Sequence, residues 1–188
     1  MFNPIKIFGN WEEGFVLDNH MLNSEFLGYD DKGKEQFNNT RTILGELTYQ
    51  LKYNNDRAKA AEVLELIANF LDNWEIASKI DLIIPVPPTK KNRRYQPVFE
   101  IANVIANYLK KPAYCKFLAK ESGLQSKDGH TNLKGTIVQA KPFKKTVNIL
   151  LIDDLYSTGA TLNEACKVLK TDNHVNNIYV LIMTKTRR

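Results

Sequence analysis

The chain has 188 residues, of which 43% are hydrophobic and 25% are charged. This balance excludes a disordered chain and fits one globular domain, or a core domain with a small appendage. The net charge of +5 is compatible with a phosphate-rich ligand or with nucleic acid, but it does not decide between them.

No apolar run approaches the roughly 20 residues that a membrane span needs. Residues 1–15 lack the charged-then-apolar layout of a signal peptide. We therefore expect a cytoplasmic protein without a membrane span. Cys115 and Cys166 lie in apolar patterns and not in C-x-x-C spacing. They predict two reduced core thiols rather than a disulfide or a metal site.

The N-terminal part of the sequence predicts a small α+β cap, or hood, over residues 1–77. Glycines separate short apolar and aromatic runs in residues 1–39, which is typical of short strands and loops. Leucines recur with helical spacing from Leu44 to about Tyr53, and a second apolar stripe covers 57–71. Two helices are therefore expected to follow the strand region.

Residues 78–188 predict an α/β core. Short apolar runs predict strands at 82–86, 113–118, 147–152 and 178–183, and helical spacing predicts helices at 98–109 and 160–170. Strands and helices that alternate in this way form a parallel sheet with helices on both faces. Residues 119–136 carry several glycines among polar residues, and a loop of this length predicts a lid.

The strongest functional signal lies between Ile149 and Thr161. An apolar strand runs into Asp153 and Asp154, then into a turn rich in glycine and hydroxyl groups, then into a helix. Ligands of parallel sheets bind beyond the carboxyl ends of the strands. The first amides of a helix attract phosphate, and Gly159 lets the backbone approach phosphate oxygens closely. Carboxylates only accept hydrogen bonds when ionised, so they suit sugar hydroxyls or Mg²⁺.

A purely structural interpretation of this string stays open. Serine, threonine and glycine often cap a strand-to-helix turn, and acids near a helix start can serve its dipole. Two adjacent acids repel each other, however, and ending a buried strand with both is unfavourable unless something positive binds there. The whole string therefore indicates a ligand site, whereas Asp153 and Asp154 alone would not decide between a ligand site and a structural role.

The string resembles the signature with which type I phosphoribosyltransferases bind phosphoribosyl pyrophosphate (PRPP). Residues 83–96, 51–56 and 124–135 resemble segments of the competence protein F (ComF) branch, and they occur in that family's order. The resemblance covers about residues 44–186. It implies transfer of ribose 5-phosphate from PRPP to a nucleophile, release of pyrophosphate, and Mg²⁺ as cofactor.

The resemblance also implies a role for each matched residue. Asp153 and Asp154 would be the catalytic carboxylates near the ribose, and they would serve Mg²⁺ directly or through ribose or water. The other residues form three groups by the part of the ligand they would meet. The 5′-phosphate would be bound by Ser157, Thr158, Gly159, Ala160 and Thr161, the pyrophosphate by Pro88, Thr89, Lys90, Lys91 and Arg93, and the flexible lid would contribute Gln125, Lys127 and Asn132.

The sequence departs from the family pattern at several positions. It has no cysteine before Cys115, so we expect a protein without the four-cysteine zinc module that ComF-like proteins often carry. Pro97 stands where the branch usually has a glutamine, and Gly129 stands where it usually has an arginine. Relatives that act on 6-oxopurines usually have an aspartate where this chain has Ser157. These changes bear on the acceptor more than on PRPP.

Three functions stay open from the sequence. The first is an active transferase with an unidentified small-molecule acceptor such as an amine. The second is a PRPP sensor or regulator on the same fold, because a fold does not fix an activity. The third is a DNA-uptake accessory, although the aromatic residues form no regular base-stacking pattern for nucleic acid. The sequence also leaves a homodimer open.

Overall fold

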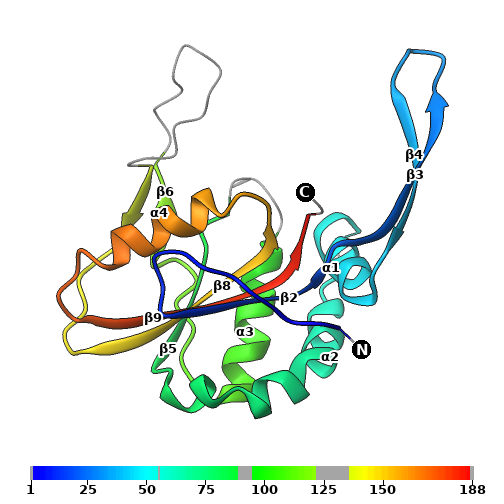
Figure 1. The fold of residues 1–188 in the computed structure, drawn as a ribbon. Coiled ribbons are helices and arrows are strands. Elements are labelled where there is room, and N and C mark those ends of the chain that lie inside the picture. Colours follow the sequence, from blue (N-terminus) through cyan, green and yellow to red (C-terminus); the bar gives the residue numbers. More distant parts are fainter. Residues whose placement is uncertain (1, 55, 89–94, 122–135, 187–188) are drawn as a thin grey trace.

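The computed structural model describes residues 2–54, 56–88, 95–121 and 136–186 (Figure 1). A five-stranded sheet lies at its centre, in the order β1-β2-β9-β8-β5. Its last four strands are parallel, and β1 runs antiparallel to β2. The strands are β1 (Ile5–Lys6), β2 (Glu13–Asn19), β9 (Val175–Lys185), β8 (Val147–Tyr156) and β5 (Leu82–Pro85).

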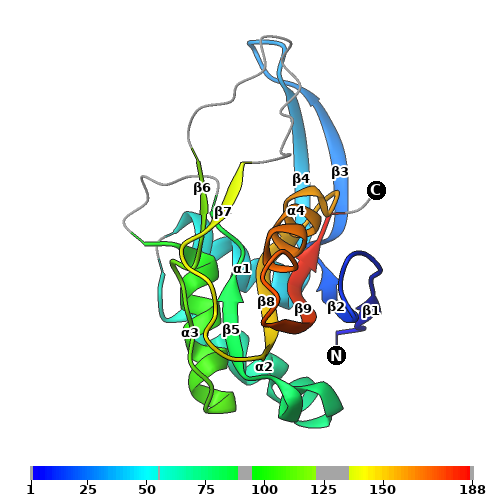
Figure 2. The same ribbon diagram turned by 90° about the vertical axis from the view of Figure 1, so that its left-hand side faces the viewer.

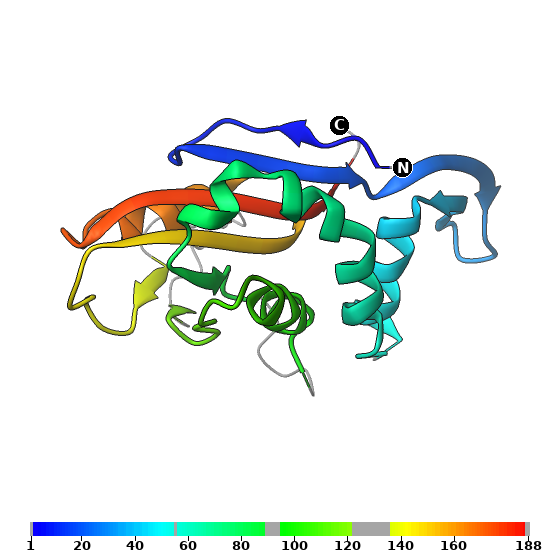
Figure 3. The same cartoon turned by 90° about the horizontal axis from the view of Figure 1, so that it is seen from below.

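Helices cover both faces of the sheet, as Figures 2 and 3 show from two sides. Three helices pack on one face, and α4 packs on the other, where its buried stripe includes Leu162 and Leu169. Successive strand residues separate accordingly, since Leu150 joins the first core cluster and Leu151 the second. The helices are α1 (Ile43–Tyr53), α2 (Lys59–Asn73), α3 (Pro97–Leu109) and α4 (Ala160–Leu169), and a 3₁₀ turn, η1 (Glu75–Lys79), precedes β5. The predicted α/β fold is confirmed.

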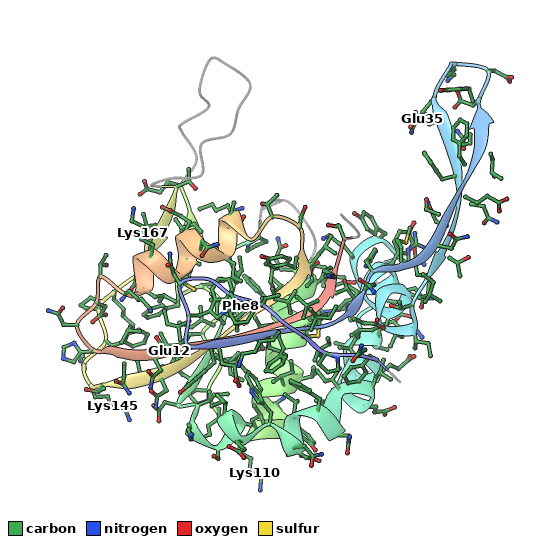
Figure 4. All side chains as sticks on the ribbon, in the orientation of Figure 1. Phe8, Glu12, Glu35, Lys110, Lys145 and Lys167 are labelled. Atoms are coloured by element: carbon green, nitrogen blue, oxygen red, sulfur yellow. The ribbon has the colours of Figure 1, made fainter. Side chains whose placement is uncertain are left out.

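Two small antiparallel sheets lie outside the central sheet. β3 (Met21–Tyr29) and β4 (Glu35–Arg41) form a hairpin that stands away from the body, with Glu35 on its outer part (Figure 4). β6 (Leu118–Lys120) pairs with β7 (Ile137–Gln139). These short strands flank residues 122–135, so most of the predicted lid lies outside the described residues.

The strand predicted at 113–118 is wrong in most of its length. Only Ala113 forms a bridge to the central sheet, through Ile83, and β6 begins at Leu118 outside that sheet. The physical reason is exposure. Tyr114 is 46% exposed, and the amide of Phe117 bonds to the Tyr114 carbonyl, so the chain turns away from the sheet edge after one residue. The run was apolar enough for a strand, but its buried residues, Phe117 and Leu118, come after this turn.

The N-terminal strands lie partly in the central sheet. β2 pairs in parallel with β9 from Glu13 to Asn19, so the sheet draws on residues assigned to the predicted cap. The division at residues 77 and 78 remains a prediction. Within the described ranges, no helix combines the length and the apolar character required for crossing a membrane.

Cys166 provides a simple test of the packing. Its thiol is fully buried on α4, and burial raises the pKa of this thiol to about 12. In a Cys115→Ser variant at pH 8, we expect native protein to release almost no thionitrobenzoate from Ellman's reagent, because only a thiolate reacts. Unfolding in guanidinium chloride should then release one equivalent. Rapid reaction of the folded variant would contradict the packing of α4.

Candidate functional site

The two predicted acids lie near the carboxyl end of β8. The strand continues to Tyr156, beyond the predicted end at 152, because β9 is long enough to pair with it as far as Lys185. β5 ends earlier, at Pro85, and Pro87 and Pro88 lack the amide hydrogen that a further ladder would need. The acids therefore lie in the part of β8 that extends beyond the end of β5, and a cavity lies beside them.

Asp153 and Asp154 occupy successive strand positions, so their side chains leave opposite faces of the sheet. Asp153 lines a small cavity beside the turn that leads into α4. Asp154 faces the other side, where its carboxylate pairs with Lys52 of α1. Both acids also line a larger cavity of about 370 Å³ at the end of the strand. Asp153 thus faces the turn before α4, and Asp154 faces α1.

The environment of Asp153 favours its neutral form. Burial of the side chain and the neighbouring Asp154 carboxylate raise the pKa of Asp153 well above its ordinary value. The amide of Asp154 donates to Asp153 Oδ1 at 2.8 Å, and Lys52 acts in the opposite direction, but burial and the like charge outweigh both. A cation in the cavity would relieve this repulsion. The pair therefore favours a positive group close to its carboxylates.

The turn after β8 provides a second, smaller cavity. Gly159 precedes α4 with φ at 75°, a conformation that favours glycine, and it offers no side chain to cap the helix. A cavity of about 90 Å³ lies against this turn. Its lining consists of Asp153 and residues 155–162, which include all the predicted 5′-phosphate residues: Ser157, Thr158, Gly159, Ala160 and Thr161. Amides of a first helical turn and hydroxyl groups are good donors to a phosphate.

The larger cavity is enclosed from three directions. Val86, Pro87 and Pro88 follow β5, Lys120 comes from β6, and Lys52 comes from α1. Burial lowers the pKa of Lys120, while Asp153 acts to raise it. Two lysines and two carboxylates therefore meet in one cavity, an arrangement that can accept a ligand bearing both phosphate groups and hydroxyl groups.

The residues present fit Mg²⁺. Mg²⁺ in proteins is commonly held by one or two carboxylates together with substrate phosphates, rather than by a cage of protein ligands. Asp153 and Asp154 supply the carboxylates. The raised pKa of Asp153 shows that a nearby positive charge would stabilise its ionised form. In the described ranges, no three His, Cys, Asp or Glu side chains gather to form a metal cage. A magnesium ion here would therefore need further oxygen atoms from the bound substrate.

The structure brings together part of the predicted site. Asp153, Asp154, Thr161 and Pro88 share the larger cavity, and the residues of the turn share the smaller one. The other predicted pyrophosphate residues and the predicted lid residues fall outside the described ranges. They are Thr89, Lys90, Lys91, Arg93, Gln125, Lys127 and Asn132.

Sequence reasoning missed the contribution of α1 and β6. Lys52 and Tyr53 line the larger cavity from the end of α1, and Lys120 lines it from the start of the predicted lid. Lys52 lies in the segment 51–56 that resembles the ComF branch, which was a usable signal. No comparable signal in the sequence pointed to Lys120.

Comparison with known proteins identifies the class of fold. No protein-family model matches the chain. Adenine phosphoribosyltransferase from Trypanosoma brucei, in complex with AMP, pyrophosphate and ribose 5-phosphate, matches with a TM-score of 0.52 at 10% identity, covering 98% of this chain and 86% of that one. The enzyme from Leishmania tarentolae gives a TM-score of 0.50 at 10% identity, with 98% and 95% covered. The chain has the type I phosphoribosyltransferase fold.

A sequence comparison narrows this class. The chain is 34% identical over 91 residues to competence protein ComFC of Bacillus subtilis (strain 168). The matched segment covers 47% of this chain but only 38% of ComFC, so it spans well under half of that relative. The predicted resemblance to the ComF branch is confirmed over this segment, in a chain that has the type I phosphoribosyltransferase fold.

Proposed function

We propose that the protein binds PRPP with Mg²⁺ and transfers ribose 5-phosphate to a small nucleophile, releasing pyrophosphate. The observation that carries the proposal is the pair of adjoining cavities at the end of β8, which share Asp153. The smaller cavity suits a 5′-phosphate, and the larger one suits the ribose and the pyrophosphate. A cytoplasmic location forms part of the proposal.

Each group of residues has a task in this reaction. The turn at 157–161 holds the 5′-phosphate through its amides and hydroxyl groups. Asp153 and Asp154 accept hydrogen bonds from the ribose hydroxyls and stabilise the positive charge that develops on the ribose as the bond to pyrophosphate breaks. Mg²⁺, when bound, neutralises charge on the leaving pyrophosphate. Lys120 adds a further positive charge on that side.

Two alternatives remain, and each predicts a different binding result. A PRPP sensor would bind PRPP without turnover. A DNA-uptake accessory, which the similarity to competence protein ComFC favours, would bind single-stranded DNA in a salt-sensitive way that PRPP does not compete.

The test begins with calorimetric titration of PRPP in the presence and absence of Mg²⁺. A pool of metabolites is then incubated with protein, Mg²⁺ and PRPP, and mass spectrometry identifies compounds that gain a phosphoribosyl group. Binding together with a modified acceptor supports the transferase. Absence of PRPP binding would overturn the proposal.

Ser157 leads to a prediction about the acceptor. Relatives that act on 6-oxopurines usually have an aspartate at this place, which exchanges a proton with the purine ring. A serine hydroxyl has no comparable basicity near neutral pH, so we expect hypoxanthine, guanine and xanthine to be poor acceptors. A spectrophotometric assay compares them with ammonia and glutamine. Efficient turnover of any of the three purines would contradict the prediction, and new purine activity in a Ser157→Asp variant would support it.

A further inference from the structure

We infer that Lys52 is a positioning residue of the PRPP site, which holds the Asp154 carboxylate in the orientation that receives the ribose. The inference rests on the proposed function, because it assigns a role in PRPP binding. It adds a residue from α1, about one hundred positions away in sequence, to a site that was predicted from the β8 strand and the turn after it.

The ion pair between Lys52 and Asp154 is protected from solvent. Lys52 Nζ lies 2.9 Å from Asp154 Oδ2, and the two side chains are 23% and 14% exposed. No other ion pair in the described part of the chain has both partners less than a quarter exposed. Exposed pairs contribute little because water and salt screen them, whereas a pair at this depth is screened less.

The backbone that carries Lys52 is fixed before any ligand arrives. Leu51 is fully buried, and its carbonyl accepts a hydrogen bond from the hydroxyl of Tyr95, which is itself buried. Tyr95 lies just after the predicted pyrophosphate-binding segment. The last turn of α1 therefore contacts the segment before α3 through Leu51 and strand β8 through Lys52.

The backbone of Asp154 is also fixed, which leaves the direction of its carboxylate to Lys52. Its carbonyl accepts a hydrogen bond from Thr184 Oγ1 at 3.3 Å, and its amide donates to Asp153 Oδ1. Thr184 is fully buried, and its Oγ1 lies 3.1 Å from His20 Nδ1. With the main chain held in this way, the ion pair on Oδ2 sets the orientation in which the carboxylate meets a ribose hydroxyl.

This role predicts which part of the ligand depends on Lys52. A residue that acts through Asp154 should matter for ligands that contain ribose. A lysine that merely attracts negative charge should matter equally for pyrophosphate, which contains none. Arginine at the same place keeps the charge and can still pair with a carboxylate. The two roles can therefore be separated by the choice of ligand and by a conservative variant.

The experiment measures dissociation constants by calorimetry for PRPP, ribose 5-phosphate and pyrophosphate, each with Mg²⁺. Lys52→Met should weaken PRPP and ribose 5-phosphate about tenfold or more and change pyrophosphate less than about twofold. Lys52→Arg should restore most of the loss. Lys59→Met removes the lysine of an ion pair on α2 away from the site and serves as the matched control. Thermal melting checks the fold of each variant, and Lys52→Gln replaces the methionine variant if that one is unstable.

The outcomes are distinct. Equal weakening of pyrophosphate, or unchanged PRPP affinity in Lys52→Met, would overturn the positioning role while leaving the proposed function intact. A wild-type protein that binds neither PRPP nor ribose 5-phosphate would overturn the proposed function and this inference with it. Selective loss of the ribose-containing ligands, restored by arginine, supports the role.

Discussion

A double variant with Asp153→Asn and Asp154→Asn is expected to lose PRPP binding by a factor of about 10² to 10⁴. Hydrogen bonds that involve a charged group contribute roughly 1.5–3 kcal/mol each, and both carboxylates are removed. Asparagine keeps the size of the side chain but removes the charge that attracts Mg²⁺. Isothermal titration calorimetry with Mg²⁺ measures the change directly.

The hairpin formed by β3 and β4 supplies a matched control for this variant. Asp30 and Asp31 are also adjacent acids, but they lie at the hairpin turn, away from both cavities. Converting both to asparagine makes the same change in net charge. PRPP affinity that is unchanged in the Asp153/Asp154 variant, or reduced equally in both variants, would contradict the assignment of the site.

Gly45→Ala is expected to destabilise the protein by roughly 1–3 kcal/mol. Alanine in place of glycine inside a helix ordinarily stabilises it. Here, however, an added Cβ would lie 2.2 Å from the backbone carbonyl oxygen of His20. A backbone atom cannot move aside as a flexible side chain can, so α1 must shift away from the start of β3. Urea denaturation gives the change in the free energy of unfolding.

The same variant tests the link between α1 and the site. Thr42 caps α1 by accepting from the Gly45 amide, and its hydroxyl also donates to the Asn19 carbonyl. A shift here would be carried along the helix to Lys52. We therefore expect weaker PRPP binding as well as lower stability. An exposed helical position, through Ala61→Gly on α2, provides a comparison that should lose only about 0.5–1 kcal/mol. A Gly45→Ala protein more stable than wild type would contradict the close packing.

The predictions from sequence succeeded where local pattern and chain order carry the information. The strand, acids, turn and helix from Ile149 to Thr161 are continuous in sequence, so their arrangement followed from hydrophobic periodicity and from helix capping. The helices beginning near Leu44 and Ala60 were predicted for the same reason. The family resemblance then connected the string to a chemical class.

The missed features depend on contacts between distant segments. The pairing of Lys52 with Asp154 follows from the packing of α1 against β9, and no local pattern in either segment reveals it. The place of β2 beside β9 is a sheet contact between the two ends of the described chain. The bridge at Ala113 shows the opposite error, because an apolar run was assigned a strand although the sheet takes up a single residue of it.

The position of β2 has a consequence for how the protein folds during synthesis. Glu13 pairs with Tyr179, and Asn19 pairs with Lys185, so the first strand of the parallel sheet must wait for a partner that follows much later in the chain. Contacts this far apart in sequence slow folding, because a long loop must close before they contribute. Val16 and Leu17, both fully buried in the finished sheet, would stay exposed on the nascent chain until then. A chaperone that binds short apolar segments would find its target in this strand during that interval.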